Sequence, residues 1–251
     1  MDQSIALIGA IAVAVFGLII GSFLNAALWR MRVRRSLVSD RSRCPHCKHV
    51  LGPAELIPVF SFFWQRGRCR HCRRKISWWY PGIELATAAV FCVNWFRFGL
   101  STEFFYVTVI SAFLIVIFVY DARYSLILDR VSLPGAALAF IGSLLLGVPF
   151  WDVLLGALIG GGFFFLQYVI SRGRWIGGGD MRLGLLLGAF LAWPEIVFAL
   201  CLAYILGSLY GIGLVLSKKK SWQSAIPFGT FLSLAAYIFY LMSDRVLPYL
   251  T

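Results

Sequence analysis

Two acidic side chains lie at the ends of apolar stretches of this chain. Asp121 directly follows an apolar run at residues 113–120, and Asp180 follows three glycines and precedes another apolar run. An acidic residue near the hydrocarbon of a bilayer costs roughly 2.5–3.5 kcal/mol on insertion scales, so each should have a specific role. One interpretation is that each marks a helix end, with Asp180 capping free backbone N–H groups. Asp129 lies in a more polar turn beside Arg130 and is predicted to cap a helix or pair with an arginine.

If the chain brings them together, Asp121 and Asp180 could catalyse hydrolysis. Like charges at close range cannot both ionise easily, so the two carboxyl groups would share one proton and titrate as a unit. The ionised member would draw a proton from water, and the protonated member would polarise the scissile carbonyl group. Elimination favours this chemistry. All three histidines lie in the first third of the chain, which argues against a Ser-His-Asp triad within the membrane. No H-E-x-x-H, P-loop or dinucleotide-binding motif occurs either.

Four cysteines form two C-x₂-C pairs separated by 21 residues: Cys44 with Cys47, and Cys69 with Cys72. Such spacing is typical of a structural zinc site, in which four thiolates complete a tetrahedron. The surrounding Arg-rich segment, residues 31–80, is too short to bury much core, so a metal would supply folding free energy. Two disulfides or a redox pair are the alternative. The three histidines are predicted to be bystanders, because four cysteines saturate the metal.

The composition predicts a membrane protein that crosses the bilayer several times. Of 251 residues, 60% are hydrophobic and 14% are charged, and the mean hydropathy is +0.83. Soluble domains are roughly 45–50% apolar and 25% charged, so a water-soluble globule and a disordered chain are both excluded. The net charge is +12, but thirteen of the 23 basic residues lie between Arg30 and Lys75, beside the first long apolar run. This placement indicates membrane topology and attraction to anionic lipid, and no nucleic-acid partner is expected.

Eight apolar runs predict an all-α fold with eight transmembrane helices, since backbone polar groups in lipid must be satisfied internally. The runs cover residues 4–28, 83–98, 104–120, 131–150, 153–170, 183–193, 196–216 and 225–242. The run at 183–193 is short for a span and could join the next run as one kinked helix. Joining them would place Lys218, Lys219 and Lys220 outside and break the positive-inside pattern, so eight spans are predicted.

This topology places both termini outside. It places the loop at residues 31–80 on the cytoplasmic side, together with Asp121 and Asp180. The first run is expected to be a retained helix and not a cleaved signal. A cytoplasmic loop argues against stable disulfides. The predicted organisation is a first transmembrane helix at residues 1–30, a cytoplasmic Cys₄ zinc-binding loop at 31–80, and a membrane-embedded catalytic part with seven helices at 81–251.

Further motifs occur in a fixed order along the chain. They are Gly21-Ser22-Phe23-Leu24-Asn25, the paired C-x₂-C loop, Ile76-Ser77-Trp78-Trp79-Tyr80-Pro81-Gly82-Ile83-Glu84, the segment from Asp121 to Asp129, Gly177-Gly178-Gly179-Asp180, and Ile226-Pro227-Phe228-Gly229. This ordered set covers nearly the whole chain and resembles the bacterial type IV prepilin peptidases, the leader peptidases of the G-x-G-D aspartic protease class.

The resemblance implies an eight-helix protease of the bacterial inner membrane. It would remove the short basic leader from type IV prepilins or pseudopilins at the cytoplasmic face, with Asp121 and Asp180 as catalytic residues supported by Gly177 and Gly179. Many members also N-methylate the new N-terminal residue with S-adenosylmethionine, but no residue pattern here is assigned to that donor. Leu128 stands where many members have Pro, and Arg182 where Lys is common; neither change removes a catalytic carboxylate.

Two functions of other classes compete with proteolysis. Intramembrane acids and glycine-broken helices also mark ion-coupled transporters, although the paired broken segments expected in two related halves are not recognised here. A nonenzymatic membrane scaffold could recruit partners through the zinc loop. Glu84 could be a buried acid with a structural partner or a substrate-binding acid, and Asn25 is expected to form a hydrogen bond between helices. The sequence favours no particular oligomeric state.

Overall fold

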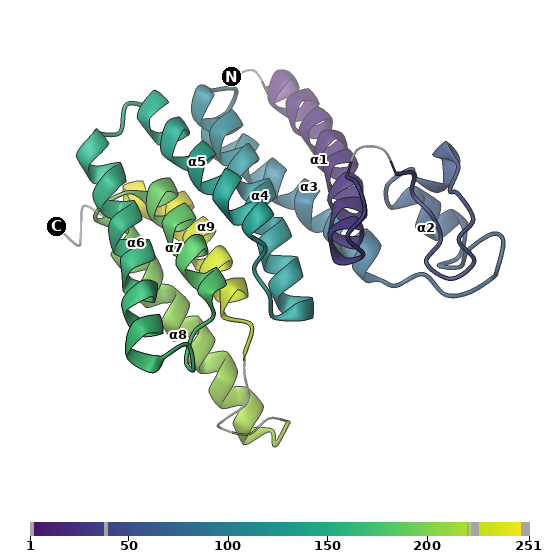
Figure 1. The fold of residues 1–251 in the computed structure, drawn as a ribbon. Coiled ribbons are helices and arrows are strands. Elements are labelled where there is room, and N and C mark those ends of the chain that lie inside the picture. The colour runs from purple at the N-terminus through teal and green to yellow at the C-terminus, as the bar shows by residue number, and fades with distance from the viewer. Residues whose placement is uncertain (1–2, 38–39, 220, 222–225, 247–251) are drawn as a thin grey trace. The chain divides into compact units, whose positions relative to one another are not determined.

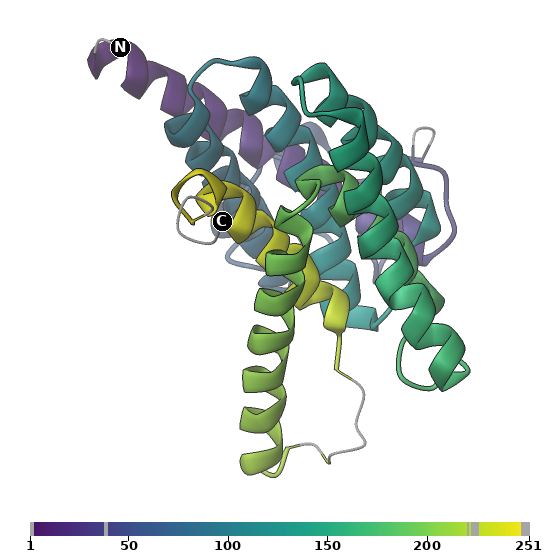
Figure 2. The same cartoon turned by 90° about the vertical axis from the view of Figure 1, so that its left-hand side faces the viewer.

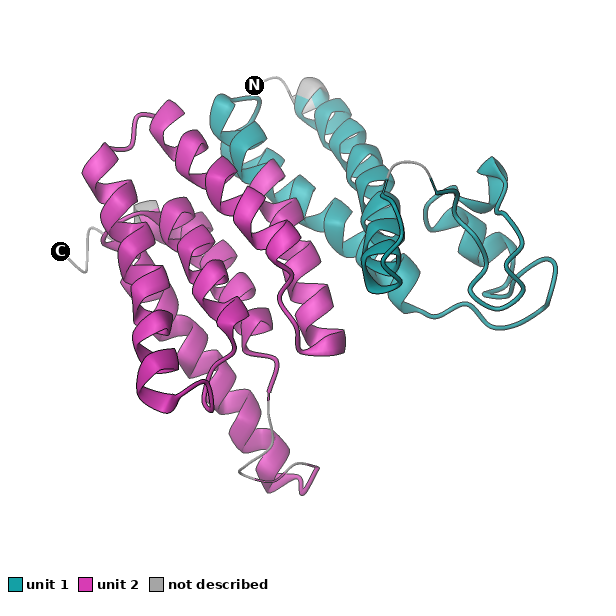
Figure 3. Cartoon of the chain, in the orientation of Figure 1, with its two compact units in different colours: residues 1–108 teal, residues 109–251 magenta. Residues whose placement is uncertain are grey.

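The computed structural model describes residues 3–37, 40–219, 221 and 226–246, and these are predominantly helical. Within those ranges β-structure is confined to two isolated bridges, between Arg43 and Val50 and between Arg68 and Lys75. The chain divides into two compact units, Met1–Thr108 and Val109–Thr251, which Figure 3 distinguishes by colour. Lys220 and Ala225, which entered the predictions of topology and of the last span, lie outside the described residues.

The first unit contains the long helices α1 and α3, which pack side by side (Figure 1). Its elements are α1 (Gln3–Arg32), η1 (Pro53–Glu55), α2 (Phe60–Trp64), α3 (Trp79–Phe98) and the start of α4 (Thr102–Tyr124). Gly17 and Gly21, four residues apart on α1, allow the close approach. A Cβ atom at Gly17 would lie 2.6 Å from the Cα of Ala88, and one at Gly21 would lie 2.7 Å from the Cα of Glu84. Small residues at this spacing are typical of helix packing in membranes.

The second unit is a bundle in which α7 is the central helix. Its elements are the remainder of α4, α5 (Asp129–Leu145), α6 (Phe150–Ser171), α7 (Gly178–Leu191), α8 (Glu195–Leu216) and α9 (Phe228–Val246). α7 contacts α5, α6, α8 and α9, and most of its apolar side chains are buried. Gly156 and Gly160 of α6 face Gly188 and Gly184 of α7, where any side chain would strike the opposite backbone. Figure 2 shows α8 running beside α9 and continuing past its start.

Each of the eight apolar runs forms a helix of its own within the described residues. Four of these helices, α1, α4, α6 and α8, are long and apolar enough to cross a membrane. Helix α9 is also apolar, over Phe228–Ser243, but this stretch is shorter. The run at 183–193 does not join the next one. α7 ends before Ala192, whose φ is 63°, and α8 begins after Pro194, so the kinked single helix is wrong.

Candidate active site and metal centre

Asp180 lies in the first turn of α7 and accepts a hydrogen bond from the residue that precedes this helix. Gly177 is the N-cap, in extended conformation, and its backbone N–H donates to Asp180 Oδ2 at 3.1 Å. The carboxylate therefore stabilises the helix N-terminus, as in the capping interpretation. The side chain nevertheless stays half-buried and lines a cavity, so capping and a second role are compatible.

Gly178 and Gly179, the other two of the three glycines before Asp180, have different surroundings. A Cβ atom at Gly179 would lie 2.8 Å from the Cβ atom of Ile127, so only glycine fits against that residue. A Cβ atom at Gly178 would meet no atom within 4 Å. Gly179 is therefore set by packing within the protein, whereas Gly178 is open toward the cavity that it lines.

Asp121, near the end of α4, is 4% exposed and is held by the first turn of α9. The backbone N–H of Thr230 donates to Asp121 Oδ2 at 2.8 Å, and the Thr230 hydroxyl donates to the same oxygen at 3.1 Å. Gly229 lets the helix approach, because a Cβ atom there would lie 3.1 Å from that oxygen. Free N–H groups at a helix N-terminus favour a negative charge, so this arrangement suits an ionised carboxylate.

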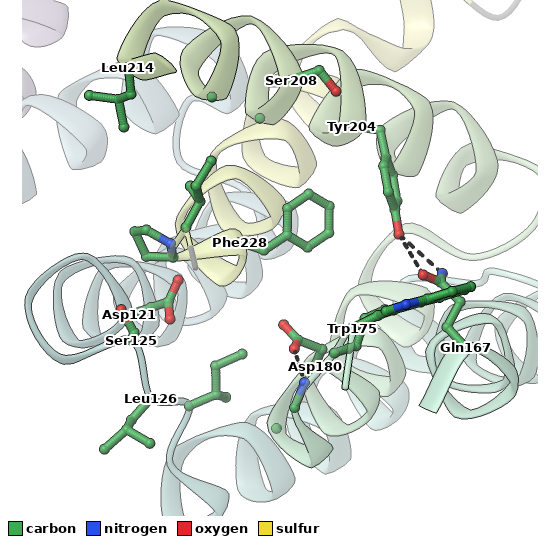
Figure 4. Close-up of a pocket in the computed structure, with 18 of the residues that line it drawn as sticks. Asp121, Ser125, Leu126, Gln167, Trp175, Asp180, Tyr204, Ser208, Leu214 and Phe228 are labelled. Atoms are coloured by element: carbon green, nitrogen blue, oxygen red, sulfur yellow. Dashed lines mark hydrogen bonds between the residues drawn. The ribbon is translucent and has the colours of Figure 1, made fainter. Parts of the chain in front are cut away.

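Asp121 and Asp180 line one cavity of about 820 Å³ in the second unit. Figure 4 shows both carboxyl groups pointing into this cavity and toward each other. The structure thus brings together two acids that lie far apart in the sequence. Asp129 is not among the cavity residues; it forms an ion pair with Arg182 of α7, in agreement with the predicted pairing role.

The remaining cavity lining is mostly apolar with a few polar groups, as is usual for ligand sites. Gln167 and Tyr204 hydrogen bond to each other at 3.1 Å (Figure 4), and the Trp175 side chain is 71% exposed. The sequence reasoning missed these residues and Thr230. Gln167 and Tyr204 carry a recognisable signal, a polar group inside an apolar run, and Thr230 directly follows the motif that ends at Gly229.

The four loop cysteines come together with a geometry that fits a metal ion. Their sulfur atoms all lie within 4.8 Å of one another, and Cys44 Sγ lies 3.9 Å from Cys72 Sγ. A tetrahedral zinc ion with Zn–S bonds of about 2.3 Å requires sulfur atoms about 3.8 Å apart. All four are free thiols, in place of the two disulfides of the alternative interpretation.

Both cysteine pairs lie on the same kind of tight turn. Lys48 donates its backbone N–H to the carbonyl of Cys44, and Arg73 donates to that of Cys69, each at 3.0 Å. Burial raises the pKa of the Cys44 thiol, but hydrogen bonds from the backbone N–H groups of Cys47 and His46 outweigh this and lower the pKa to about 7. Thiolate, the form that binds metals, is therefore accessible near neutral pH.

Glu84 connects α3 to the middle of the loop, and Asn25 connects α1 to the first turn of α3. Glu84 is 8% exposed, and its Oε2 accepts the backbone N–H of Val59 at 2.7 Å. The Asn25 side chain donates to the carbonyl of Tyr80 at 2.9 Å, in the first turn of α3. These contacts favour the structural interpretation of Glu84 and agree with the interhelical role expected for Asn25.

Comparison with known proteins relates both units to one family. Residues 15–98 match the bacterial peptidase A24 N-terminal domain, and residues 108–212 match the type IV leader peptidase family. A protein of Bacillus subtilis (strain 168) named prepilin leader peptidase/N-methyltransferase is 34% identical over 94% of this chain and 95% of its own length. The chain belongs to the type IV leader peptidase family. Proteins of the same name from Pseudomonas putida and Myxococcus xanthus (strain DK1622) are 30% and 35% identical, over 92% and 84% of this chain and 90% and 65% of their own lengths.

No solved structure matches the chain. The four cysteines lie in the segment that matches the N-terminal domain, and both aspartates lie in the segment that matches the leader peptidase family. Thr230 lies beyond both segments. Since four helices among the described residues are able to span a bilayer, this member of the family is a multi-pass membrane protein.

Proposed function

We propose that the protein is a membrane-embedded aspartic endopeptidase that removes the leader from type IV prepilins or pseudopilins and N-methylates the new N-terminal residue. The observation that carries this proposal is the pair Asp121 and Asp180, whose carboxyl groups face each other across one cavity. The name shared by the relatives supplies the substrate and the second activity.

The contacts of the two carboxyl groups suggest their roles. Asp121 accepts two hydrogen bonds from Thr230, which favours its ionised form, so the shared proton resides on Asp180. Asp121 then takes a proton from water as the water oxygen attacks the scissile carbonyl carbon, and Asp180 gives its proton to the carbonyl oxygen. Collapse of the tetrahedral intermediate breaks the C–N bond: the leaving nitrogen takes the proton held by Asp121, and a hydroxyl of the intermediate returns a proton to Asp180.

The cavity walls suit a peptide stretch next to an apolar helix. Trp175 and Phe228 supply apolar surface, and the open position of Gly178 lets a substrate backbone approach the aspartates. Binding energy from the substrate's apolar helix, which would enter from the lipid, can position the scissile bond at the two carboxyl groups. Gly177 and Gly179 support the site by capping and by packing, respectively.

The topology that we propose has eight membrane spans in the bacterial inner membrane, with both termini outside. The loop at residues 31–80 and both aspartates then lie at the cytoplasmic face, where a leader would be presented. The positive-inside pattern supports this orientation. We assign residues 1–30 to the first span, 31–80 to the metal-binding loop and 81–251 to the catalytic membrane part.

Zinc is the ion that we propose for Cys44, Cys47, Cys69 and Cys72, with a structural role. Four thiolates leave no coordination position open, so this ion would hold the loop together and would not take part in hydrolysis. The second activity requires a methyl donor, for which we propose S-adenosylmethionine. We assign no residue of this chain to that donor.

Mass spectrometry of a model prepilin incubated with the purified protein tests the proposal. We expect the loss of a leader-sized mass, followed by the gain of one methyl group when S-adenosylmethionine is added. An ion-coupled transporter or a membrane scaffold would leave the prepilin mass unchanged. An unchanged mass with correctly folded, membrane-inserted protein would therefore overturn the assignment as a peptidase.

A further inference from the structure

A second group of potential metal ligands lies on the cysteine loop, formed by His49, Glu55 and His71. One ligand atom from each residue lies within 4.8 Å of the other two. The imidazole rings of His49 and His71 stack, with centroids 3.4 Å apart and an interplanar angle of 30°. Both histidines are exposed, whereas Glu55, at the end of η1, is half-buried.

The carboxylate of Glu55 is only partly satisfied by the protein. Its Oε2 accepts the backbone N–H of Gly52 at 2.9 Å. Its Oε1 is buried and has no hydrogen-bond partner within the part of the chain that the structure describes. A buried carboxylate oxygen without a partner is costly, so a ligand at this position is expected.

We propose that His49, Glu55 and His71 bind a second divalent transition-metal ion, of the zinc class. Two imidazole nitrogens and one carboxylate oxygen are the donors of three-ligand zinc sites, which leave a fourth position open to water or to another ligand. Imidazole donors favour zinc and its neighbours over magnesium or calcium. The ion would supply the missing partner of Glu55 Oε1.

Binding requires rotation of exposed side chains, because the stacked imidazole rings must turn out of their stack before both nitrogen lone pairs can point at one ion. Ligand atoms about 2.0–2.1 Å from a tetrahedral zinc ion lie about 3.3–3.4 Å apart. The three side chains already lie within 4.8 Å of one another, and the two exposed imidazoles can rotate to close the difference. The occupied site would bind η1 to both cysteine turns, since His49 follows one C-x₂-C pair and His71 lies within the other.

The loop provides a matched control for this site. His71 is the third residue of Cys69-Arg70-His71-Cys72, and His46 is the third residue of Cys44-Pro45-His46-Cys47. The two positions are equivalent in the two turns, but only His71 belongs to the second cluster. Replacing either histidine therefore disturbs the cysteine site in the same way, and a difference between the two variants reports on the second site.

Cobalt(II) titration of the full-length, metal-free protein in detergent tests the proposal. Cobalt bound to thiolates gives strong charge-transfer absorption, whereas cobalt on two imidazoles and a carboxylate gives only weaker d–d bands. We expect one equivalent of each kind for the wild type and for His46→Asn. In His71→Asn and Glu55→Gln the second equivalent should be lost while the charge-transfer band remains.

A second equivalent that persists in both His71→Asn and Glu55→Gln would overturn the proposal, as would a wild type that binds cobalt only through thiolates. Glu55→Gln decides the matter if His71→Asn also weakens the charge-transfer band, because Glu55 lies outside both cysteine turns. None of these readouts depends on cleavage of a prepilin, so failure of the second site and failure of the peptidase assignment are distinguishable.

Discussion

The aspartate cavity and the cysteine loop hold their reactive groups in place by different means. Asp121 and Asp180 lie on helices of a packed bundle. Asp121 accepts hydrogen bonds from the first turn of α9, and Asp180 accepts one from the residue that precedes its own helix. The four cysteines lie on short turns of a loop whose only helices within the described ranges are η1 and α2. Helix packing can position the acids without a ligand, whereas the thiolates need an ion to offset their mutual repulsion.

Removing one carboxylate should give the largest effect on activity and none on the loop. Asp121→Asn or Asp180→Asn keeps the size of the side chain but removes the acid–base pair, so prepilin cleavage should fall by about 1,000-fold or more. Circular dichroism and metal content should match the wild type. Near wild-type cleavage by either variant would show that the pair is not catalytic.

Removing the metal should instead unfold the cysteine loop and leave the helices of the second unit intact. Zinc contributes about 10–16 kcal/mol to the folding of zinc-finger peptides, so chelation or Cys44→Ser should unfold the loop. Limited proteolysis read by mass spectrometry should then show new cuts between residues 40 and 78, with the helices of the second unit still protected. Cys201→Ser, a change of an exposed cysteine outside the loop, is the control and should leave the pattern unchanged. Equal protection of the loop with and without metal would contradict the structural role.

The two centres also differ in how well the sequence predicts them. Ligand spacing within a C-x₂-C turn is local, so the pairing of Cys44 with Cys47 and of Cys69 with Cys72 can be seen directly. The hydrophobic runs likewise predict each long helix, because apolar length is a local property. Even the weak run at 183–193 becomes a helix of its own, which Ala192 and Pro194 separate from the next.

The contacts that hold the acids are not local and could not be predicted in this way. The partner of Asp121 is Thr230, 109 residues away, and no periodicity in the sequence links the two. The motif order indicated that Gly229 matters, but not that the next residue donates two hydrogen bonds. Similarly, the group formed by His49, Glu55 and His71 was missed because four cysteines saturate one ion, which made the histidines look redundant.

Thr230 offers a smaller and more selective perturbation of the acid pair. Thr230→Val keeps the backbone N–H donor to Asp121 and the side-chain shape, but removes the hydroxyl donor. A hydrogen bond to a charged group contributes about 1.5–3 kcal/mol, so kcat should fall by roughly 10- to 100-fold. Because Thr230 does not line the cavity, KM should change little, and Thr230→Ser should restore kcat. A raised KM with unchanged kcat would instead place Thr230 in substrate binding.

The smallest expected effects come from replacing Gly179, which packs against the protein, or Gly178, which is open toward the cavity. In Gly179→Ala the new Cβ atom would lie 2.8 Å from the Cβ of Ile127, so the variant should lose about 1–3 kcal/mol of stability through overpacking. Gly178→Ala meets no protein atom within 4 Å, so its stability should stay within about 0.5 kcal/mol of the wild type. Chemical denaturation in detergent compares the two variants.

If Gly178→Ala nevertheless raises KM for prepilin, the substrate backbone passes over this glycine. If both its stability and its KM are unchanged, the open position is not used by the substrate.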